Sequence, residues 1–317
     1  MTDAAVTACV FPGQGSQSVG MMAAWGDDPI VKETMNEASD ALGEDLGALI
    51  ANGPAEALSL TTNTQPVMLV AGVAAYRAYM AAGGAQPSWL AGHSLGEYAA
   101  LVAAKTLTLA QAVPLVRLRA EAMQAAVPVG QGAMAAILGM PVDQVVAHCR
   151  AVQDGFSPTS GEVVEAVNFN DPNQTVIAGS KAAVEQAMVR IKEAGAKRAL
   201  PLPVSAPFHS SLMKPAADRL AERLDAMVFE PPTIPVLNNI DVAAPQDPQA
   251  IKAALVRQAF GPVRWVEIIQ SLSANGVTKI IECGPGKVLT GMAKRIEPSL
   301  VAVPVYDPAS LTDAMAA

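Results

Sequence analysis

The residues best suited to covalent chemistry lie in the segment Gly92-His93-Ser94-Leu95-Gly96, which fits the pattern GxSxG. A short apolar run precedes the segment and a helical pattern follows it, so the sequence predicts a strand, a sharp turn and a helix that starts at Ser94. Free N–H groups at the start of such a helix can stabilise an oxyanion. A simple helix cap is the alternative interpretation of Ser94. The context favours a serine nucleophile that takes up an acyl group.

A serine nucleophile needs a base, and the chain has only three histidines. His93 adjoins Ser94 on the turn, so its side chain should diverge from the serine and pack or hydrogen-bond elsewhere. His148 lies in a polar helical segment typical of a surface. His209, in "SAPFHSSLM", lies where two domains are expected to join, and cleft-facing loops often carry catalytic residues. His209 is therefore the candidate base. Because no acid follows the usual hydrolase order, its orienting group could be a main-chain carbonyl.

One arginine stands out in the helical segment "LVRLRAEAM". Arg117 has Glu121 four residues later, which predicts a surface ion pair. Arg119 points to the opposite face, where its neighbours are apolar, and a buried guanidinium requires an anion from elsewhere. Two sources remain open: a distant Asp or Glu, or a substrate carboxylate held by the guanidinium fork. In the second case the acyl group would belong to a dicarboxylic half-thioester.

Two glycine-rich segments imitate nucleotide-binding motifs without completing them. "GQGSQS" has Ser18 where a dinucleotide fingerprint needs its third glycine, and "GPGKV" has Val288 where a P-loop needs Ser or Thr. Both are better interpreted as turns at strand ends. The first could direct a backbone N–H, such as that of Gln14, towards Ser94.

The bulk properties exclude several classes of protein. The chain has 317 residues and a net charge of −8, which disfavours nucleic acid as a partner. Three separated cysteines form no CxxC pair, so neither a metal site nor a disulfide framework is expected. No apolar run is long enough to span a membrane, and the N-terminus lacks a signal-peptide pattern. A cytoplasmic protein with no membrane partner is expected.

The order of segments predicts an α/β fold with an insertion. Strands alternate with helices in the first and last parts, which implies a mostly parallel sheet covered on both faces. Pro- and Gly-rich joints at 127–132 and 200–207 enclose a β-α-β-β-α-β order, the ferredoxin-like unit. We therefore expect a large domain formed by residues 1–131 and 205–317, and a small inserted domain formed by residues 132–204.

Several segments together resemble one enzyme family. In chain order they are "FPGQGSQ", "GHSLGEY", "RLRAEAMQ", "AVNFN", "PVSAPFH", "VRQ" and "GPGKVLTG". The chain resembles the malonyl-CoA:acyl carrier protein transacylases of type II fatty acid synthesis over nearly its whole length. The resemblance implies a large hydrolase-like domain with a ferredoxin-like insert, in agreement with the segment order.

The resemblance also implies roles for individual residues. Ser94 would be the acylated serine, His209 its base, and Arg119 the residue that holds the malonyl carboxylate. The backbone N–H groups of Gln14 and Leu95 would form the oxyanion hole.

Three further positions match the family pattern. The main-chain carbonyl of Gln258 would orient the catalytic histidine in place of an acid. His93 would accompany the nucleophile. Phe208 is the residue type that malonyl-selective relatives often carry before the histidine, which leaves selectivity against methylmalonyl groups open.

The implied reaction transfers malonyl from malonyl-CoA to the phosphopantetheine thiol of acyl carrier protein through a malonyl-serine, without a cofactor or metal. Because carrier proteins of the family are acidic, local basic residues should bind them, and the candidates are Lys197, Arg198, Lys287, Lys294 and Arg295. Three alternatives remain: a serine esterase or thioesterase, a non-catalytic partner in a synthase complex, and an acyltransferase that serves a polyketide synthase.

Overall fold

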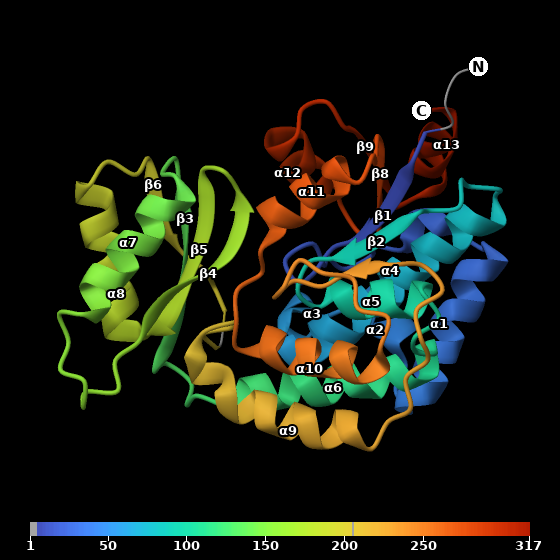
Figure 1. The fold of residues 1–317 in the computed structure, drawn as a ribbon. Coiled ribbons are helices and arrows are strands. Elements are labelled where there is room, and N and C mark those ends of the chain that lie inside the picture. Colours follow the sequence, from blue (N-terminus) through green and yellow to red (C-terminus); the bar gives the residue numbers. More distant parts are fainter. Residues whose placement is uncertain (1–4, 205) are drawn as a thin grey trace.

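The structure is a computed structural model that describes residues 5–204 and 206–317. The chain forms a large unit built on a parallel sheet and a smaller unit beside it (Figure 1). The strands of the larger sheet are β1 (Thr7–Phe11), β2 (Trp89–Gly92), β7 (Val236–Leu237), β8 (Lys279–Cys283) and β9 (Val301–Val305). They lie in the order β7-β2-β1-β8-β9, and every neighbouring pair is parallel. The expectation of an α/β fold with a mostly parallel sheet is confirmed.

Helices cover both faces of this sheet, which explains why most residues of its strands are apolar. Cys9 and Phe11 point into a core formed with α4 (Thr61–Ala81), α5 (Gly96–Ala103) and α6 (Leu109–Ala125), whereas Ala8 and Val10 point into a second core formed with α11 (Trp265–Ala274) and α12 (Val288–Ile296). The helices of the large unit are η1 (Ala23–Trp25), α1 (Pro29–Leu42), α2 (Leu46–Asn52), α3 (Ala55–Ser59), α4 (Thr61–Ala81), α5 (Gly96–Ala103), α6 (Leu109–Ala125), η2 (Ser211–Met213), α9 (Lys214–Asp225), α10 (Pro248–Ala259), α11 (Trp265–Ala274), α12 (Val288–Ile296) and α13 (Pro308–Ala316).

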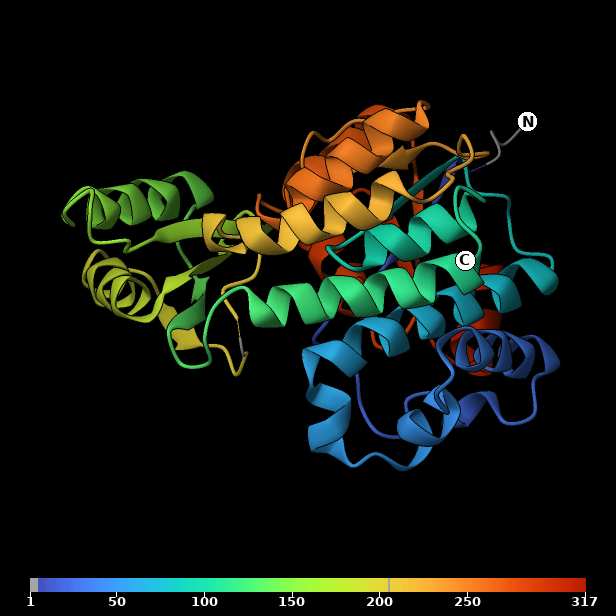
Figure 2. The same ribbon diagram turned by 90° about the horizontal axis from the view of Figure 1, so that it is seen from below.

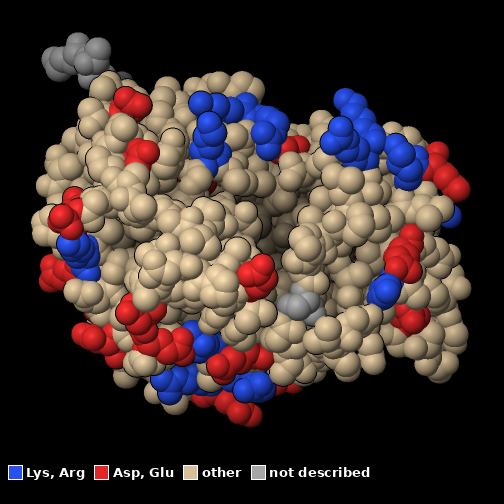
Figure 3. Space-filling model, turned by 180° about the vertical axis from the view of Figure 1, so that it is seen from behind, with Lys and Arg blue, Asp and Glu red and all other residues tan. Residues whose placement is uncertain are grey.

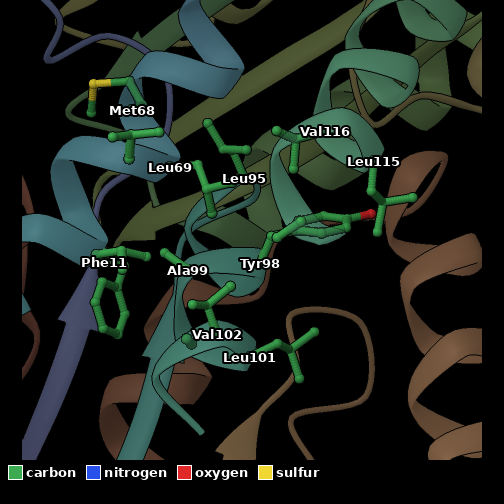
Figure 4. Close-up of a cluster of buried hydrophobic side chains, with 14 of the residues drawn as sticks. Phe11, Met68, Leu69, Leu95, Tyr98, Ala99, Leu101, Val102, Leu115 and Val116 are labelled. Carbon is green, nitrogen blue, oxygen red and sulfur yellow. The ribbon is translucent and has the colours of Figure 1, made fainter. Parts of the chain in front are cut away.

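The helix that follows Ser94 is buried along its whole length. α5 packs against β1, β2, α4 and α6, and Figure 4 shows its Tyr98 and Val102 side chains, with Leu95 just before the helix, among those of the neighbouring helices. A helix that is apolar all round is stable only inside a core. This burial fixes the start of α5, and therefore the turn that carries Ser94, in place.

The smaller unit contains an antiparallel sheet with two helices on one face. Its elements are β3 (Gly132–Leu138), α7 (Val142–Gln153), β4 (Val164–Asp171), β5 (Gln174–Ser180), α8 (Lys181–Glu193) and β6 (Arg198–Pro201). The strand order is β4-β5-β3-β6, and the neighbouring strands are antiparallel. Apolar residues of the sheet, such as Ile137 and Ile177, pack against Val145 of α7 and Val184 of α8.

Two chain connections join the units, and β4 of the smaller unit also contacts the large unit through its backbone. The chain leaves the large unit after α6 and returns to it before α9, and these two helices lie side by side (Figure 2). On the other side, β4 pairs with the segment before α11, where the N–H of Phe169 donates to the carbonyl of Val263 at 2.9 Å. β4 thus places the smaller unit close to the turn at Ser94.

Several expectations about the elements need correction. α5 starts at Gly96 rather than at Ser94. The backbone of Ser94 is left-handed, and a residue in this conformation cannot be part of a right-handed helix. In the segment "TIPVLNN", whose pattern predicts a strand, only Val236–Leu237 form one. Arg117 bonds the carboxylate of Glu44 at 2.6 Å rather than that of Glu121.

The predicted domain limits at residues 1 and 205 fall on residues outside the described part of the chain, so those limits stay predictions. Among the described residues, no helix has the length and apolarity needed to cross a membrane.

Candidate active site

Ser94 occupies a strained turn between β2 and α5. Its φ angle is +52°, a conformation that L-residues adopt rarely and mostly at functional sites. Gly92 and Gly96 are required because other parts of the backbone lie too close to admit a side chain. A Cβ on Gly92 would lie 1.9 Å from the carbonyl carbon of Gly96, and a Cβ on Gly96 would lie 2.0 Å from the carbonyl oxygen of Phe11. The side-chain oxygen of Asn239 accepts the N–H of Ser94 at 2.6 Å and stabilises the turn.

His209 lies directly against the serine. Its Nε2 is 2.7 Å from Oγ of Ser94, and its Nδ1 is 2.8 Å from the main-chain oxygen of Gln258. Because a carbonyl oxygen only accepts, Nδ1 carries the proton and Nε2 is left to accept the serine proton. His209 also has a positive φ, +65°, which directs its ring into the site. A main-chain carbonyl thus takes the place of a triad acid.

The surroundings keep His209 neutral. Burial, and then the positive charge of Arg119, lower the pKa of His209 to about 3. An uncharged imidazole can accept a proton at any pH near neutrality. The surroundings of His209 therefore hold it in the form that can accept a proton.

Arg119 is buried, with 2% of its surface exposed, and points at the same serine. Its Nη1 donates to Oε1 of Gln65 at 2.6 Å, and its Nη2 donates to Oε1 of Gln258 at 3.0 Å and to Oγ of Ser94 at 3.2 Å. Its guanidinium carbon lies 5.4 Å from the centre of the Tyr98 ring. Among the described residues, no Asp or Glu forms an ion pair with this guanidinium and its Nε has no partner. The sequence left two possible counter-ions for Arg119, a protein carboxylate and a substrate carboxylate. Among the described residues, no protein carboxylate contacts this guanidinium directly.

Gln258 connects the groups of the site. Besides its carbonyl bond to His209 and its side-chain bond to Arg119, its Nε2 donates to the carbonyl oxygen of Ser94 at 3.0 Å and to Oε2 of Glu97 at 2.9 Å. One residue of α10 therefore contacts the base, the arginine and the nucleophile backbone together.

Two backbone N–H groups lie beside the serine. Gln14 and Leu95 both line the cavity above Ser94, and within residues 5–204 and 206–317 neither backbone nitrogen donates a hydrogen bond. Unpaired N–H groups at the start of a helix suit an anion. Their position fits an oxyanion hole.

A cavity of about 120 Å³ covers Ser94, His209 and Arg119. Its apolar wall comes from both units of the fold and consists of Met123, Met134, Leu202, Val204 and Phe208. A larger cleft of about 590 Å³ continues from it between the glycine-rich turn after β1, the start of α12 and the smaller unit. Figure 3 shows this hollow between the units, with Lys and Arg side chains on both of its sides.

His93 does not reach the serine. Its Nε2 donates to Oδ1 of Asn170 on β4 at 2.8 Å, and its ring lies 5.5 Å from that of Trp265. It therefore ties the turn to the smaller unit, in line with a packing and hydrogen-bonding residue. Phe208 precedes His209 on the cavity wall. His148 lies on α7, away from the cavity-lining residues.

Three residues of the site were missed by the sequence analysis: Gln65, Glu97 and Asn239. Gln65 and Glu97 are polar residues within apolar helices, the same signal that singled out Arg119, and each is 2% exposed. Asn239 follows a strand end, but its bonds join segments 145 and 147 residues apart, which local patterns do not reveal.

The comparisons with known proteins agree on one family. A profile described as acyl transferase domain matches residues 8–304. The malonyl CoA-acyl carrier protein transacylase of Salmonella typhimurium is 52% identical over 309 residues, which cover 97% of this chain and 98% of that protein. The enzyme of the same name from Bacillus subtilis is 45% identical over 305 residues, which cover 96% and 94%.

Solved structures give the same result. An acyl-carrier-protein S-malonyltransferase from Burkholderia pseudomallei has a TM-score of 0.95 and 62% identity, with 98% of this chain and 99% of that chain covered. A complex of a type II PKS acyl-carrier protein with its malonyl-transacylase matches with a TM-score of 0.94 and 50% identity, with 98% and 99% covered. The chain therefore belongs to the malonyl CoA-acyl carrier protein transacylase family of acyl transferases.

Proposed function

We propose that this protein transfers malonyl groups from malonyl-CoA to the phosphopantetheine thiol of acyl carrier protein, through a malonyl ester on Ser94. The observation that carries the proposal is the position of Arg119: a buried guanidinium 3.2 Å from the oxygen that His209 can deprotonate. A carboxylate on the acyl group could therefore bind the Arg119 guanidinium while the acyl carbonyl lies beside Ser94. The names of the relatives specify the same donor and acceptor.

In the first half of the reaction, Nε2 of His209 takes the proton of Ser94 while Oγ attacks the thioester carbonyl of malonyl-CoA. The backbone N–H groups of Gln14 and Leu95 stabilise the oxyanion. The C–S bond breaks, and CoA leaves as a thiol with the proton returned by His209. The carbonyl oxygen of Gln258 holds the imidazole in the required tautomer throughout.

The second half repeats these steps with another thiol. The phosphopantetheine thiol of the carrier protein enters the cleft, gives its proton to His209 and attacks the malonyl ester. Ser94 leaves and recovers the proton. Arg119 holds the malonyl carboxylate in both halves, so the reacting carbonyl stays in one position while the two thiols exchange.

Arg119 and the apolar wall also explain why a thiol, rather than water, receives the acyl group. The clamp fixes the ester in a narrow cavity of about 120 Å³, and the side of this cavity formed by Met123, Met134 and Phe208 offers water few polar contacts. Phe208 contributes to this wall and limits the space beside the malonyl methylene. We propose on this basis that malonyl is preferred to the bulkier methylmalonyl group.

Rapid mixing with malonyl-CoA tests the proposal. We expect a burst of free CoA equal to the number of active sites, followed by slow hydrolysis that becomes fast transfer when holo acyl carrier protein is added. Rapid, continued hydrolysis without carrier protein would identify the protein as a thioesterase. High turnover of neutral p-nitrophenyl esters would support the same contrary conclusion, since such esters cannot use Arg119.

A role in polyketide rather than fatty acid synthesis is a second candidate, favoured by the 50% identity to a transacylase solved with a type II PKS carrier protein. The chemistry at Ser94 is the same in both pathways. Comparing kcat/KM for carrier proteins of the two pathways distinguishes them, and we expect the fatty acid carrier to be preferred. A purely structural partner in a synthase would form no ester at Ser94.

The arrangement of the chain supports two domains. We propose a hydrolase-like large domain formed by residues 1–131 and 205–317, and a ferredoxin-like insert formed by residues 132–204. The βαββαβ order and the strand order β4-β5-β3-β6 support the insert.

The residues proposed for catalysis need neither a cofactor nor a metal, because they supply nucleophile, base and cation themselves. Cys9, Cys149 and Cys283 are free thiols, which fits the reducing cytoplasm that we propose as its location.

A further inference from the structure

The guanidinium of Arg119 is buried, yet its hydrogen-bond acceptors are neutral. Within the described residues, these acceptors are the side-chain oxygens of Gln65, Gln258 and Ser94. A buried cation without a nearby anion is costly, so a counter-charge is expected slightly further away.

The nearest anionic group in this network is Glu97, which lies one amide group away. Its Oε2 accepts Nε2–H of Gln258 at 2.9 Å and the backbone N–H of Asn239 at 2.8 Å. The same Gln258 side chain accepts from Arg119 through Oε1 at 3.0 Å. The amide therefore has a carboxylate at its donor end and a guanidinium at its acceptor end. Glu97 is 2% exposed and does not line the acyl cavity.

We infer that Glu97 is the counter-charge of Arg119 in the free protein, and that a malonyl group on Ser94 replaces it, so that Glu97 takes up a proton when the malonyl ester forms. This inference rests on the proposed function. It assigns Glu97 as a residue that acts through Gln258 and Arg119 without touching the acyl group.

The amide bridge explains how Arg119 can be compensated and still bind a substrate. A direct ion pair with Glu97 would occupy the guanidinium N–H groups that the malonyl carboxylate needs. Once that carboxylate arrives, two buried anions share one cation, and one of them becomes protonated. The malonyl carboxylate contacts Arg119 directly and stays ionised. Glu97 is separated from Arg119 by the amide and is the easier of the two to protonate.

The other titratable groups around Glu97 leave it as the proton acceptor. Burial raises the pKa of Glu97 to about 7, and the charge of Arg119 opposes this shift while that of Asp241 adds to it. Asp241 itself is paired with Arg257 at 2.5 Å. Burial raises the pKa of Tyr98 to about 12, and burial lowers that of His209 to about 3, so both stay neutral near pH 7.

The transfer of the acyl group from CoA to Ser94 does not itself contribute to the proton uptake. The Ser94 oxygen forms a bond to the acyl carbon, the C–S bond breaks, and the serine proton ends on the CoA thiol through His209. Well below the pKa of about 8.5 of an ordinary thiol, this exchange neither binds nor releases protons, and nearer that pKa the partial ionisation of the released CoA thiol is the same for both donors. Acetyl-CoA follows the same chemistry but brings no carboxylate. The difference between the two donors therefore reports the proton bound by Glu97.

The experiment mixes the protein with malonyl-CoA or acetyl-CoA in weakly buffered solution with a pH indicator, while intact mass measures how much acyl-serine forms. We expect malonylation to bind about half a proton per ester at pH 7, more at pH 8 and less at pH 6, because Glu97 is already protonated at lower pH. Acetylation should bind none. Equal uptake with the two donors would overturn the inference.

Variants identify the group that binds the proton. Glu97→Gln keeps an acceptor for Gln258 and Asn239 but cannot titrate, so its malonyl ester should form without proton uptake. Glu282→Gln is the matched control: Glu282 is fully buried and bonds the start of α12, and uptake should persist in this variant. Uptake that is unchanged in Glu97→Gln would contradict the assignment.

A second measurement needs only the wild-type protein. The infrared difference between its malonyl-ester and free forms should show the gain of a protonated carboxyl, and no such band would overturn the inference. If no malonyl ester forms in the wild-type protein, the proposed function fails together with the inference. If the ester forms without extra proton uptake, only the inference fails.

Discussion

Nη2 of Arg119 lies 3.2 Å from Oγ of Ser94. The cation and the nucleophile are therefore within the span of a three-carbon diacid, so one residue cluster can select the acyl donor and also carry out the chemistry. The same arginine charge contributes to the low pKa of His209, so the residue proposed to select the donor also helps to keep the proposed base neutral.

Replacing Arg119 with alanine should damage malonyl transfer selectively. Loss of charge-assisted hydrogen bonds to the malonyl carboxylate costs about 3 kcal/mol, on the order of 100-fold in kcat/KM for malonyl-CoA. Acetyl transfer should fall much less, and steady-state assays with the two donors measure both. Arg117→Ala is the matched control, because Arg117 is on the same helix but bonds Glu44 away from the cavity. Equal losses for malonyl and acetyl in Arg119→Ala would remove its proposed role.

The low pKa of His209 predicts the pH dependence of acylation. The neutral imidazole is the active form, and a pKa of about 3, lowered by burial and by Arg119, leaves it neutral well below pH 7. The burst rate with malonyl-CoA should therefore not fall between about pH 7 and pH 5, where an ordinary histidine would lose activity. Stopped-flow measurement of CoA release across this range checks it. A decline with a midpoint near the ordinary histidine pKa would show that His209 is not held neutral in this way.

The turn at Ser94 should tolerate no side chain at Gly96. An alanine Cβ there would lie 2.0 Å from the carbonyl oxygen of Phe11, so β1 and α5 would have to separate. We expect Gly96→Ala to lower the thermal unfolding midpoint by about 10 °C or more, which corresponds to several kcal/mol in a protein of this size. Gly47→Ala in helix α2 is the control. A Cβ at residue 47 would lie 3.4 Å from Oδ1 of Asp45, an ordinary van der Waals contact, so this substitution should be neutral or stabilising. Similar unfolding midpoints for the two variants would contradict the steric account.

Carrier-protein binding should depend on the exposed basic residues beside the cleft. Arg198 begins β6 and Lys197 directly precedes it, while Lys287 directly precedes α12 and Lys294 and Arg295 lie in its last turn. Reversing their charges should raise the KM for carrier protein by about 10-fold at low salt and lower its salt dependence.

Transfer from preformed malonyl-enzyme to a small thiol separates docking from chemistry, and this rate should stay unchanged in the charge-reversal variants. Arg219→Glu, on the exposed side of α9, is the control for a general charge effect. Carrier-protein kinetics that do not change after reversal would place the docking surface elsewhere.

Local sequence patterns predicted the elements that carry the site because each pattern reports a local requirement. GxSxG reflects the close backbone approach at Gly92 and Gly96, and the apolar surroundings of Arg119 in the sequence correspond to its 2% exposure. The boundary of α5 was wrong by two residues, since the left-handed φ of Ser94 depends on packing between β1 and α5.

The connections between these residues were not accessible in the same way. The bond between His209 and Gln258 spans 49 residues, and that between Glu97 and Gln258 spans 161. Such contacts are made by tertiary packing and leave no periodic pattern. Only the family resemblance pointed to Gln258, and it pointed to the carbonyl rather than to the side chain that joins Arg119 to Glu97.

Intact-protein mass spectrometry after exposure to malonyl-, methylmalonyl- and acetyl-CoA tests the central claim most directly. We predict a mass increase of one malonyl group on the wild-type protein, much less modification by the other two donors, and none on Ser94→Ala. No malonyl adduct on the wild-type protein, or an equal adduct on Ser94→Ala, would contradict a malonyl ester at Ser94.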